Sequence, residues 1–540
     1  VLGSNDSNFY AVVAKHIVDS NNWINLTFDN KDWLDKPHFP FWLIAISYKI
    51  FGISVFAYIL PGFIFNVIGG FYTYLLAKHI FASREVGLLS ALIYFTSLHL
   101  MLSSIDIRQE AFLLGEIIPA CYYWYLYNEQ PNINKKYLIL GGVFTALAMM
   151  TKGIFVLLTI FSGLVVVWIV TKNWRNFVSK KWLFALLISF VFIAPELITL
   201  YLQFDAHPEK IVFGKQNISG ILWFFWGSQF GRFFDTGAIT SGKASSIGHY
   251  FYFIHTMFWA ILPWSFVVFF AFVNILKSIK ISKNVLQSLR TQKARLNYIY
   301  LLASFIPTFV LFSLTKFQLD HYTNILIPFL AILCADFLFN TTTKLAYHPI
   351  FKIQVGLSYL LCAIVIVLSL IIFTGQLFIA FLVCSMVVVG LFAVLINNYP
   401  LTKAILFSVL SMLLVFVFLE AVNAKLYSQY EVGYQINKYL SGTNNNYELI
   451  DYKVNSLSLE LFAKSGYKRV DCSKKIESVN KPYYLVVNDK QTSIASLESS
   501  NIILLLNRFK YIKQEKFIPT LFNEHKQESA MNIVSLYLIK

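Results

Sequence analysis

Charged residues are scarce in this 540-residue sequence, where they make up 13% of the chain. Soluble domains carry about 25% charged residues. Hydrophobic residues make up 57% and aromatic residues 17%, with 52 Phe and 31 Tyr. This deficit of charge excludes an ordinary soluble enzyme and indicates that lipid surrounds most of the chain. The composition predicts a polytopic α-helical membrane protein.

The sequence also lacks a metal-binding or disulfide pattern of cysteines. Its five cysteines are widely spaced and four lie inside apolar runs, so we interpret them as small core residues. We find no internal repeat, low-complexity tract or nucleotide-binding glycine loop. The glycines of "IGGFYTY" and "GGVFTAL" lie in apolar runs, where they let helices pack closely.

Apolar runs long enough to cross a bilayer, about 20 residues each, occur throughout the first 421 residues. They lie near 56–77, 86–104, 109–127, 137–150, 154–171, 182–203, 251–276, 297–314, 322–339, 354–374, 376–396 and 402–421. The sequence therefore predicts about twelve transmembrane helices. Because the chain opens with Val1 and the polar "GSNDSNFY", we expect one more helix to precede it.

The net charge of +16 is distributed unevenly between alternate connections. One set, from "LAKHIFASRE" to "NNYPLTK", carries 17 Lys and Arg, whereas the opposite set carries seven. Lys and Arg accumulate on cytoplasmic loops, so the first set is predicted to be cytoplasmic. The basic charge then indicates orientation, and no nucleic-acid partner is predicted.

Two domains follow from this topology. Residues 1–421 are predicted to form the transmembrane domain, with outer-face loops at 1–55 and 204–249. Residues 422–540 are more polar and contain the short β-like runs "YYLVV", "IILLL" and "IVSLYLI". They are predicted to form a small α/β domain on the outer side of a bacterial inner membrane.

Most unusual polar residues fall on the predicted outer face. A single lysine at a helix end is often only an interfacial residue, but acids and bases from at least four segments converge here. Ionisable residues at membrane depth usually mark a functional cavity. The candidates are Asp6, Asp32, Asp35, Lys36, His38, Asp106, Arg108, Glu110, Lys152, His207, Glu209, Lys210, Arg232, Lys316, Asp320, His321 and Tyr322.

A polyprenyl-phosphate sugar matches this chemistry. Its phosphate needs fixed cations, for which Lys36, Arg108 and Lys152 are candidates, and its apolar tail suits a groove between helices. Attack on the anomeric carbon needs an acceptor that a carboxylate positions or deprotonates, and such help contributes about 10²- to 10⁴-fold. Cations placed in advance stabilise the departing phosphate.

Five segments, in order, resemble bacterial GT-C glycosyltransferases related to aminoarabinose transferase, which modifies lipid A, and to protein O-mannosyltransferases. They are "NDSNFYAVVAKHIVDSNNW…DKPHFPFWLIAISYKIFG", "DIRQEAFLLG", "MMTKGIFVL", "FDAHPEK…FWGSQFGR" and "KFQLDHYTNILIP". The resemblance covers roughly residues 5–340. It implies that Asp6 is the catalytic or acceptor-positioning acid and that Lys36, Lys152 and Tyr322 lie near the lipid phosphate.

The chain departs from the family pattern at three places. The second acid of the family's "DE" pair is replaced by Ser7, and "EKPP" reads "DKPH", which leaves Asp35 and His38 without an assigned role. The family's second acidic position falls on Glu110 or on Asp106. The two would share a face if both lay on one helix.

The leading hypothesis is an inverting transferase that moves a sugar from a polyprenyl-phosphate donor to lipid A, another glycan or a protein. Arg108, Lys316 and Tyr322 would assist Lys36 and Lys152 at the phosphate. No cofactor or metal is required, and a metal site at His38, His207 or His321 ranks low. The alternatives are a transporter or flippase of an anionic or lipid-linked substrate, and a binding-only relative.

Overall fold

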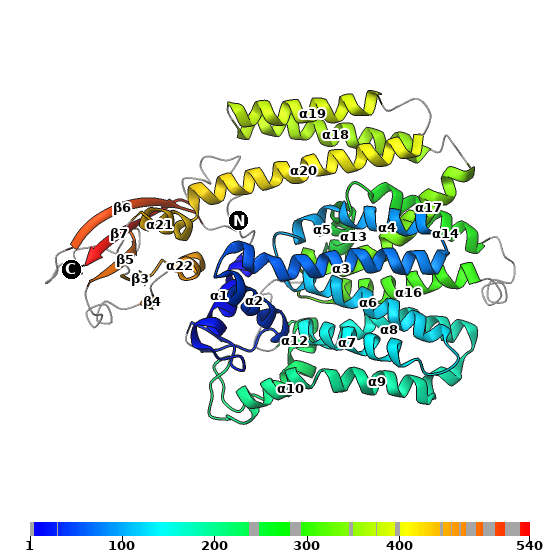
Figure 1. Cartoon of the computed structure of the whole chain (residues 1–540), viewed down its shortest axis with the longest axis horizontal. Coiled ribbons are helices and arrows are strands. Elements are labelled where there is room, and N and C mark those ends of the chain that lie inside the picture. Colours follow the sequence, from blue (N-terminus) through cyan, green and yellow to red (C-terminus); the bar gives the residue numbers. More distant parts are fainter. Residues whose placement is uncertain are drawn as a thin grey trace. The chain divides into compact units, whose positions relative to one another are not determined.

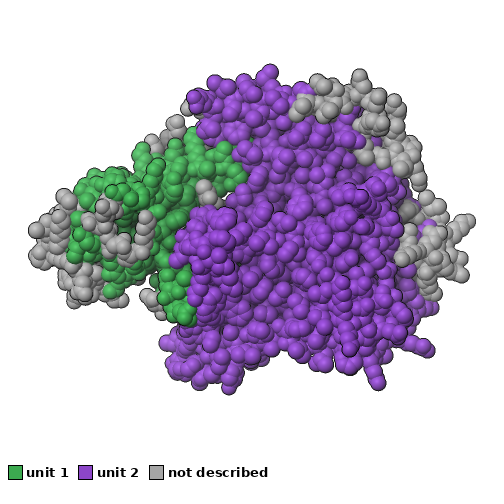
Figure 2. Space-filling model, viewed as in Figure 1, with its two compact units in different colours: residues 1–21, 27–31, 418–540 green, residues 22–26, 32–417 purple. Residues whose placement is uncertain are grey.

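The computed structural model describes residues 5–29, 31–236, 248–280, 293–344, 349–373, 375–394, 400–442, 447–454, 456–463, 466–470, 482–489, 503–512 and 530–539. Residues 237–247 of the predicted outer loop, and Cys472, lie outside these ranges. Contacts divide the chain into two compact units, coloured green and purple in Figure 2. Unit 1 contains residues 1–21, 27–31 and 418–540, and unit 2 contains residues 22–26 and 32–417.

Unit 2 is helical. Its elements are α2 (Phe39–Phe51), α3 (Val55–Phe81), α4 (Arg84–Phe95), α5 (Leu98–Ser103), α6 (Gln109–Glu129), α7 (Lys135–Lys152), α8 (Val156–Thr171), α9 (Lys180–Phe192), α10 (Ala194–Leu200), α11 (Gly220–Leu222), α12 (Ser228–Phe234), α13 (Gly248–Ala260), α14 (Ser265–Lys280), α16 (Lys293–Leu314), α17 (Ile327–Lys344), α18 (Pro349–Ile372), α19 (Gln376–Val394) and most of α20 (Pro400–Tyr430). A 3-10 segment, Asp320–Leu326, leads into α17. Shorter 3-10 or π-helical turns lie at Trp174–Val178, Tyr201–Asp205 and Trp223–Gly227.

Each of the twelve predicted apolar runs falls on one to three of these segments. Within the described residues, five helices are long and apolar enough to cross a membrane, or up to seven if each bent pair counts as one span. The run at 182–203 bends by 43° between α9 and α10, and the run at 251–276 bends by 114° between α13 and α14. The run at 86–104 is divided into α4 and α5. Continuous apolar sequence therefore did not reveal these breaks.

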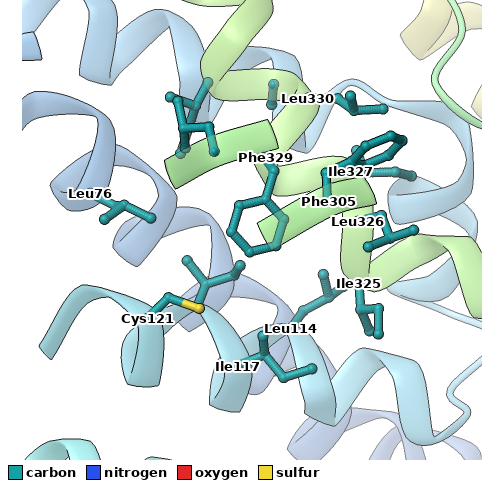
Figure 3. Close-up of a cluster of buried hydrophobic side chains, with 14 of the residues drawn as sticks. Leu76, Leu114, Ile117, Cys121, Phe305, Ile325, Leu326, Ile327, Phe329 and Leu330 are labelled. Atoms are coloured by element: carbon teal, nitrogen blue, oxygen red, sulfur yellow. The ribbon is translucent and has the colours of Figure 1, made fainter. Parts of the chain in front are cut away.

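The core of unit 2 forms where α3, α6 and α16 meet α17. Leu76, Leu114, Phe305 and Phe329, one from each of these helices, belong to a single cluster of buried side chains, part of which Figure 3 shows. In an apolar stretch of 18 residues within Asp320–Asn340, 89% of the residues are buried, which makes α17 the most enclosed of the five long apolar helices in the described residues.

Small residues allow α3 and α6 to approach closely, and the two helices run alongside each other in Figure 1. A Cβ at Gly69 would lie 2.8 Å from the carbonyl oxygen of Leu114, so a larger residue would push the helices apart. Gly141 similarly accommodates the indole of Trp124. The close packing predicted for the two glycine-containing runs is confirmed. Cys121, Cys334 and Cys362 are buried as predicted, whereas for Cys384, which is exposed, that prediction is wrong.

Unit 1 contains a five-stranded sheet with strand order β4-β3-β5-β7-β6. The strands are β3 (Glu448–Tyr452), β4 (Tyr467–Val470), β5 (Tyr483–Asn488), β6 (Ile503–Tyr511) and β7 (Asn532–Ile539). β3 is parallel to β4 and β5, whereas β7 is antiparallel to β5 and β6. Every residue of β5 is buried, which explains why five of its six residues, "YYLVV", are aromatic or aliphatic. The three β-like runs predicted from the sequence are β5, β6 and β7.

Helices α21 (Val432–Leu440) and α22 (Leu457–Phe462) complete unit 1 together with an N-terminal segment. That segment contains α1 (Asn5–Ser20), which packs against α22, and β1 (Thr27–Phe28), which pairs with β2 (Lys31–Asp32). The domain boundary between residues 421 and 422 stays a prediction. Contacts place residues 5–21 in the same compact unit as the C-terminal sheet, whereas the sequence predicted that these residues belong to the transmembrane domain.

A buried acid, Glu431, connects α21 with α22. Both Ser456 and Ser458 donate hydrogen bonds to its carboxylate, and the Ser458 hydroxyl accepts a bond from the Gly433 backbone N–H. Burial nevertheless raises the pKa of Glu431 to about 7 from an ordinary value of 4.5. An acid with a raised folded-state pKa contributes stability below pH 4.5 that is lost as the pH rises through about 7.

We therefore expect Glu431→Gln to stabilise unit 1 at alkaline pH. The substitution removes a costly ionisation, so the free energy of unfolding at pH 8.5 should exceed that of the wild type by on the order of 1–3 kcal/mol. Native-state hydrogen exchange of the β5 amides, corrected for intrinsic rates, measures this difference. Equal wild-type and variant stability at pH 8.5 would contradict the expectation, and the difference should shrink near pH 5.

Candidate functional site

The stretch before α2 is held in place by a buried pair that links it to α10. The ring of His38 is 1% exposed and its Nδ1 lies 3.0 Å from Glu196 Oε1. The His38 backbone N–H donates to Glu196 Oε2 at 3.0 Å, and Nε2 lies 2.8 Å from the carbonyl oxygen of Ile24. Each ring nitrogen of His38 therefore lies within hydrogen-bond distance of an oxygen, one from Glu196 and one from Ile24. His38, left unassigned from the sequence, thus has a positioning contact.

His38→Leu should destabilise unit 2 by about 3–5 kcal/mol, because Glu196 would keep a buried charge without its partner. All eleven tryptophans lie between residues 23 and 264, so their fluorescence reports the unfolding of unit 2 in detergent. The double variant His38→Leu/Glu196→Met removes both polar groups and should recover most of the loss. A single variant as stable as the wild type would show that the pair contributes nothing.

Next to His38, Asp35 joins two cations. Its carboxylate lies 3.0 Å from Lys36 Nζ and also forms an ion pair with the guanidinium of Arg232 on α12. Burial alone would raise the pKa of Asp35, but Lys36 and Arg232 outweigh it and hold the pKa below the ordinary value. Asp35 is therefore a carboxylate that orients two cations.

A second charged cluster lies where α6 begins and α7 ends. Glu110, in the first turn of α6, is 2% exposed and forms an ion pair with Lys152 in the last turn of α7. These positions suit the helix dipoles, because a carboxylate is favoured at an N-terminus and a cation at a C-terminus. Gly153 then ends α7 with a φ of +99°, a conformation that favours glycine. The Lys152 ammonium also lies 4.0 Å from the ring centroid of Tyr322.

His321, in the 3-10 segment before α17, also belongs to this second cluster. Its Nε2 lies 3.8 Å from Glu110 Oε2, and its Nδ1 contacts both the Arg108 guanidinium and, at 3.1 Å, Asp320 Oδ1. Arg108 also pairs with Asp106 at 3.1 Å. Asp106 and Glu110 do not lie on one helix, because α6 begins at Gln109, so they do not share a helix face. Of the two acids, Glu110 is the one that contacts Lys152 and His321.

A cavity of about 340 Å³ lies between the two clusters. Its cationic lining residues are Lys152 and Arg232, one from each cluster, and Tyr322 adds a phenol. Ser228, Gln229 and Thr315 are its other polar lining residues. The rest of the lining is apolar and comes from Ile154, Phe155, Leu158, Phe230, Phe233, Phe234, Leu311, Phe312 and Phe317. Such a cavity suits a ligand that has a small anionic group and a large apolar part.

Six predicted candidates are not placed in these clusters: Asp6, Asp32, His207, Glu209, Lys210 and Lys316. Asp6 lies in the first turn of α1 and belongs to unit 1. The side chain of Lys316 is exposed. His207 and Glu209 pair with each other at 3.0 Å, with side chains 50% and 68% exposed. The described part of the chain contains no group of three or more His, Cys, Asp or Glu side chains that could hold a metal.

Sequence reasoning did not identify Glu196 or Gln109. Glu196 interrupts the apolar run "FIAPELITL", and an acid within such a run was an available signal. Gln109 is 2% exposed, and its side-chain amide has no hydrogen-bond partner among the described residues. No spacing or composition signal marked Gln109. Asp32 and Lys210, from the candidate list, form a separate ion pair at 3.0 Å.

The architecture is that of a GT-C membrane protein, as a solved relative shows. ArnT from Cupriavidus metallidurans bound to undecaprenyl phosphate matches with a TM-score of 0.71 over 99% of this chain and 94% of that one, at 15% identity. The apo form of the same protein matches with a TM-score of 0.70. The predicted fold, a polytopic helical GT-C protein with a C-terminal sheet domain, is confirmed.

Sequence comparison points to the same group of proteins. Residues 35–198 match the family described as dolichyl-phosphate-mannose-protein mannosyltransferase. An uncharacterized protein of Aquifex aeolicus is 27% identical over 344 residues, which are 63% of this chain and 60% of that protein. Undecaprenyl phosphate-alpha-4-amino-4-deoxy-L-arabinose arabinosyl transferase 2 of Proteus mirabilis is 24% identical over 345 residues, 62% of this chain and 55% of its own length. The predicted resemblance to aminoarabinose transferases and protein mannosyltransferases is confirmed.

Proposed function

We propose that this protein transfers a sugar from a polyprenyl-phosphate donor to an acceptor, with inversion at the anomeric carbon. The observation that carries the proposal is the apolar cavity with Lys152 and Arg232 in its lining. Each cation is held by its own carboxylate, Glu110 for Lys152 and Asp35 for Arg232. A solved structure of similar fold contains undecaprenyl phosphate, which has this combination of anionic head and apolar tail.

The donor phosphate would bind between the two cations, near the Tyr322 phenol and within reach of Lys36. The polyprenyl chain would lie against the phenylalanine side chains that line the cavity. This arrangement positions the donor before reaction and places positive charge where the phosphate gains negative charge, which stabilises the transition state. No step of the scheme requires a metal.

The reaction exchanges one bond at the anomeric carbon for another. The acceptor oxygen forms a bond to this carbon while the bond to the phosphate oxygen breaks, and its electron pair leaves with the polyprenyl phosphate. The acceptor proton passes to a carboxylate, the role proposed for Asp6. Glu110 and Asp35 orient cations in this scheme, so Glu110 acts through Lys152.

The acceptor is a lipid, a glycan or a protein at the outer face of a bacterial inner membrane. The distribution of basic residues supports this orientation. The named relatives are transferases, which favours transfer over the transporter alternative.

Reconstitution in vesicles tests the function. With polyprenyl-phosphate sugar and a membrane extract as acceptor source, mass spectrometry should detect free polyprenyl phosphate and a glycosylated product. Donor that crosses the bilayer unchanged would support the transporter instead. Comparison of lipid A, glycans and membrane proteins from a deletion strain then identifies the acceptor.

A further inference from the structure

The helix that carries Asp6 is attached to the C-terminal domain by two neighbouring side chains. Lys15 and His16 occupy consecutive positions on α1, and both contact α22 within unit 1. Consecutive residues on an α-helix point about 100° apart. Two attachments at that angle fix the rotation of α1 about its axis, which a single contact would leave free.

The first attachment is a buried lysine that caps a helix. Lys15 is 7% exposed, and its Nζ donates to the carbonyl oxygens of Glu460 at 2.6 Å and Ala463 at 3.3 Å. These carbonyls belong to the C-terminal end of α22, where backbone acceptors lack partners within the helix. The ammonium therefore satisfies acceptors that burial would otherwise leave unpaired.

The second attachment is an ion pair. His16 Nε2 lies 2.7 Å from Glu460 Oε1, and Nδ1 lies 3.0 Å from the carbonyl oxygen of Thr27 on β1. Both nitrogens face acceptors, so the imidazolium form satisfies both bonds when Glu460 is ionised. Burial alone would lower the pKa of His16, but Glu460 and the Thr27 carbonyl outweigh it and raise the pKa. Asp19, on α1, is the other charged group that raises it.

The helix α22 that receives both contacts is itself connected to the end of the last long membrane helix. Its Ser458 hydroxyl binds Glu431, which directly follows α20, and the Gly433 backbone. Asp6 lies ten residues before His16 on the same helix, about 15 Å along its axis. A rigid helix of this length transmits the orientation set at His16 to Asp6.

We propose that Glu460 is a positioning residue, and that the C-terminal domain orients α1 and thereby Asp6 for transfer. This inference rests on the proposed function and on the proposed role of Asp6. It assigns the C-terminal domain a part in the reaction.

Glu460→Gln in the full-length protein tests the proposal. Turnover (kcat) should fall at least 10-fold while KM for the polyprenyl-phosphate donor stays within 2-fold, because Asp6 is misoriented and the cavity is unchanged. Hydrogen exchange across α1 should rise while β5 stays protected. Glu460→Asp should recover part of the turnover, and Glu448→Gln, the same change on β3, is the matched control. Lys15→Met, which removes the other attachment, should also lower kcat selectively.

The pH dependence of kcat gives a second test, because a purely structural role of Glu460 would not change it. Wild-type kcat should decline at alkaline pH as His16 loses its proton, and Glu460→Gln should lack this step. Unchanged kcat in both Glu460→Gln and Lys15→Met, or unchanged α1 exchange, would overturn the inference. If Asp6→Asn retains full turnover, the role of Asp6 fails. If Asp6→Asn is inactive while both attachment variants keep wild-type kcat, only the inference fails.

Discussion

Asp6→Asn should lower sugar transfer by about 10²- to 10⁴-fold, the contribution expected of a carboxylate that accepts or positions a proton in the transition state. The substitution keeps the shape of the side chain and removes its charge. Asp6 is exposed in the first turn of α1, so the fold should tolerate the change. Single-turnover transfer from purified donor, at saturating concentration, measures the effect on the chemical step.

Donor binding separates a catalytic defect from a binding defect in this variant. Binding of polyprenyl phosphate should stay unchanged, because the proposed phosphate cations are untouched. Glu85→Gln, which changes an exposed acid in the first turn of α4, provides a control with an equivalent loss of charge. Wild-type transfer by Asp6→Asn would remove Asp6 from the mechanism and leave the acceptor without an assigned base.

Lys152→Met should abolish most transfer and destabilise unit 2 at the same time. Loss of the cation removes charge stabilisation of the departing phosphate, with an effect of about 10²- to 10³-fold by analogy with other preorganised groups. It also leaves Glu110, which is 2% exposed, as a buried charge without its ion-pair partner, at a cost of about 3–5 kcal/mol. Transfer rates and unfolding midpoints in detergent measure the two effects.

The double variant Glu110→Gln/Lys152→Met distinguishes catalysis from folding. Removing both charges should return most of the stability, because no unpaired carboxylate remains. Transfer should stay low, because the phosphate still lacks its cation. Recovery of transfer together with stability would show that Lys152 serves only the fold.

The sequence was sufficient to single out Lys152, Arg232 and Tyr322 of the cavity lining, but none of its apolar residues. Lys36, Lys152 and Arg232 stand out because cations are rare and costly in a chain surrounded by lipid. Their pairing was not predictable. Lys152 is 42 residues from Glu110, and Arg232 is 197 residues from Asp35. Such contacts depend on how helices pack, which one sequence does not specify.

Breaks inside apolar runs limited the prediction in the same way, although the run near 109–127 does start where α6 starts, at Gln109. The bend of 114° between α13 and α14 interrupts a run that composition presents as continuous. Periodicity and hydropathy report what surrounds a segment and say little about where its backbone turns.

The burial of α17 has a consequence for how substitutions are tolerated. The window at Asp320–Asn340 is 89% enclosed, whereas that of α18 is 33% enclosed, and α18 is the more hydrophobic of the two. The side chains of α17 must therefore fit the shapes of their neighbours, whereas the exposed side chains of α18 need only be apolar. Exchanges among Leu, Ile, Val and Phe should be nearly silent across the outer face of α18. The same exchanges in α17 should be costly, so a mutational scan of the two helices would separate packing from solvation in a single protein.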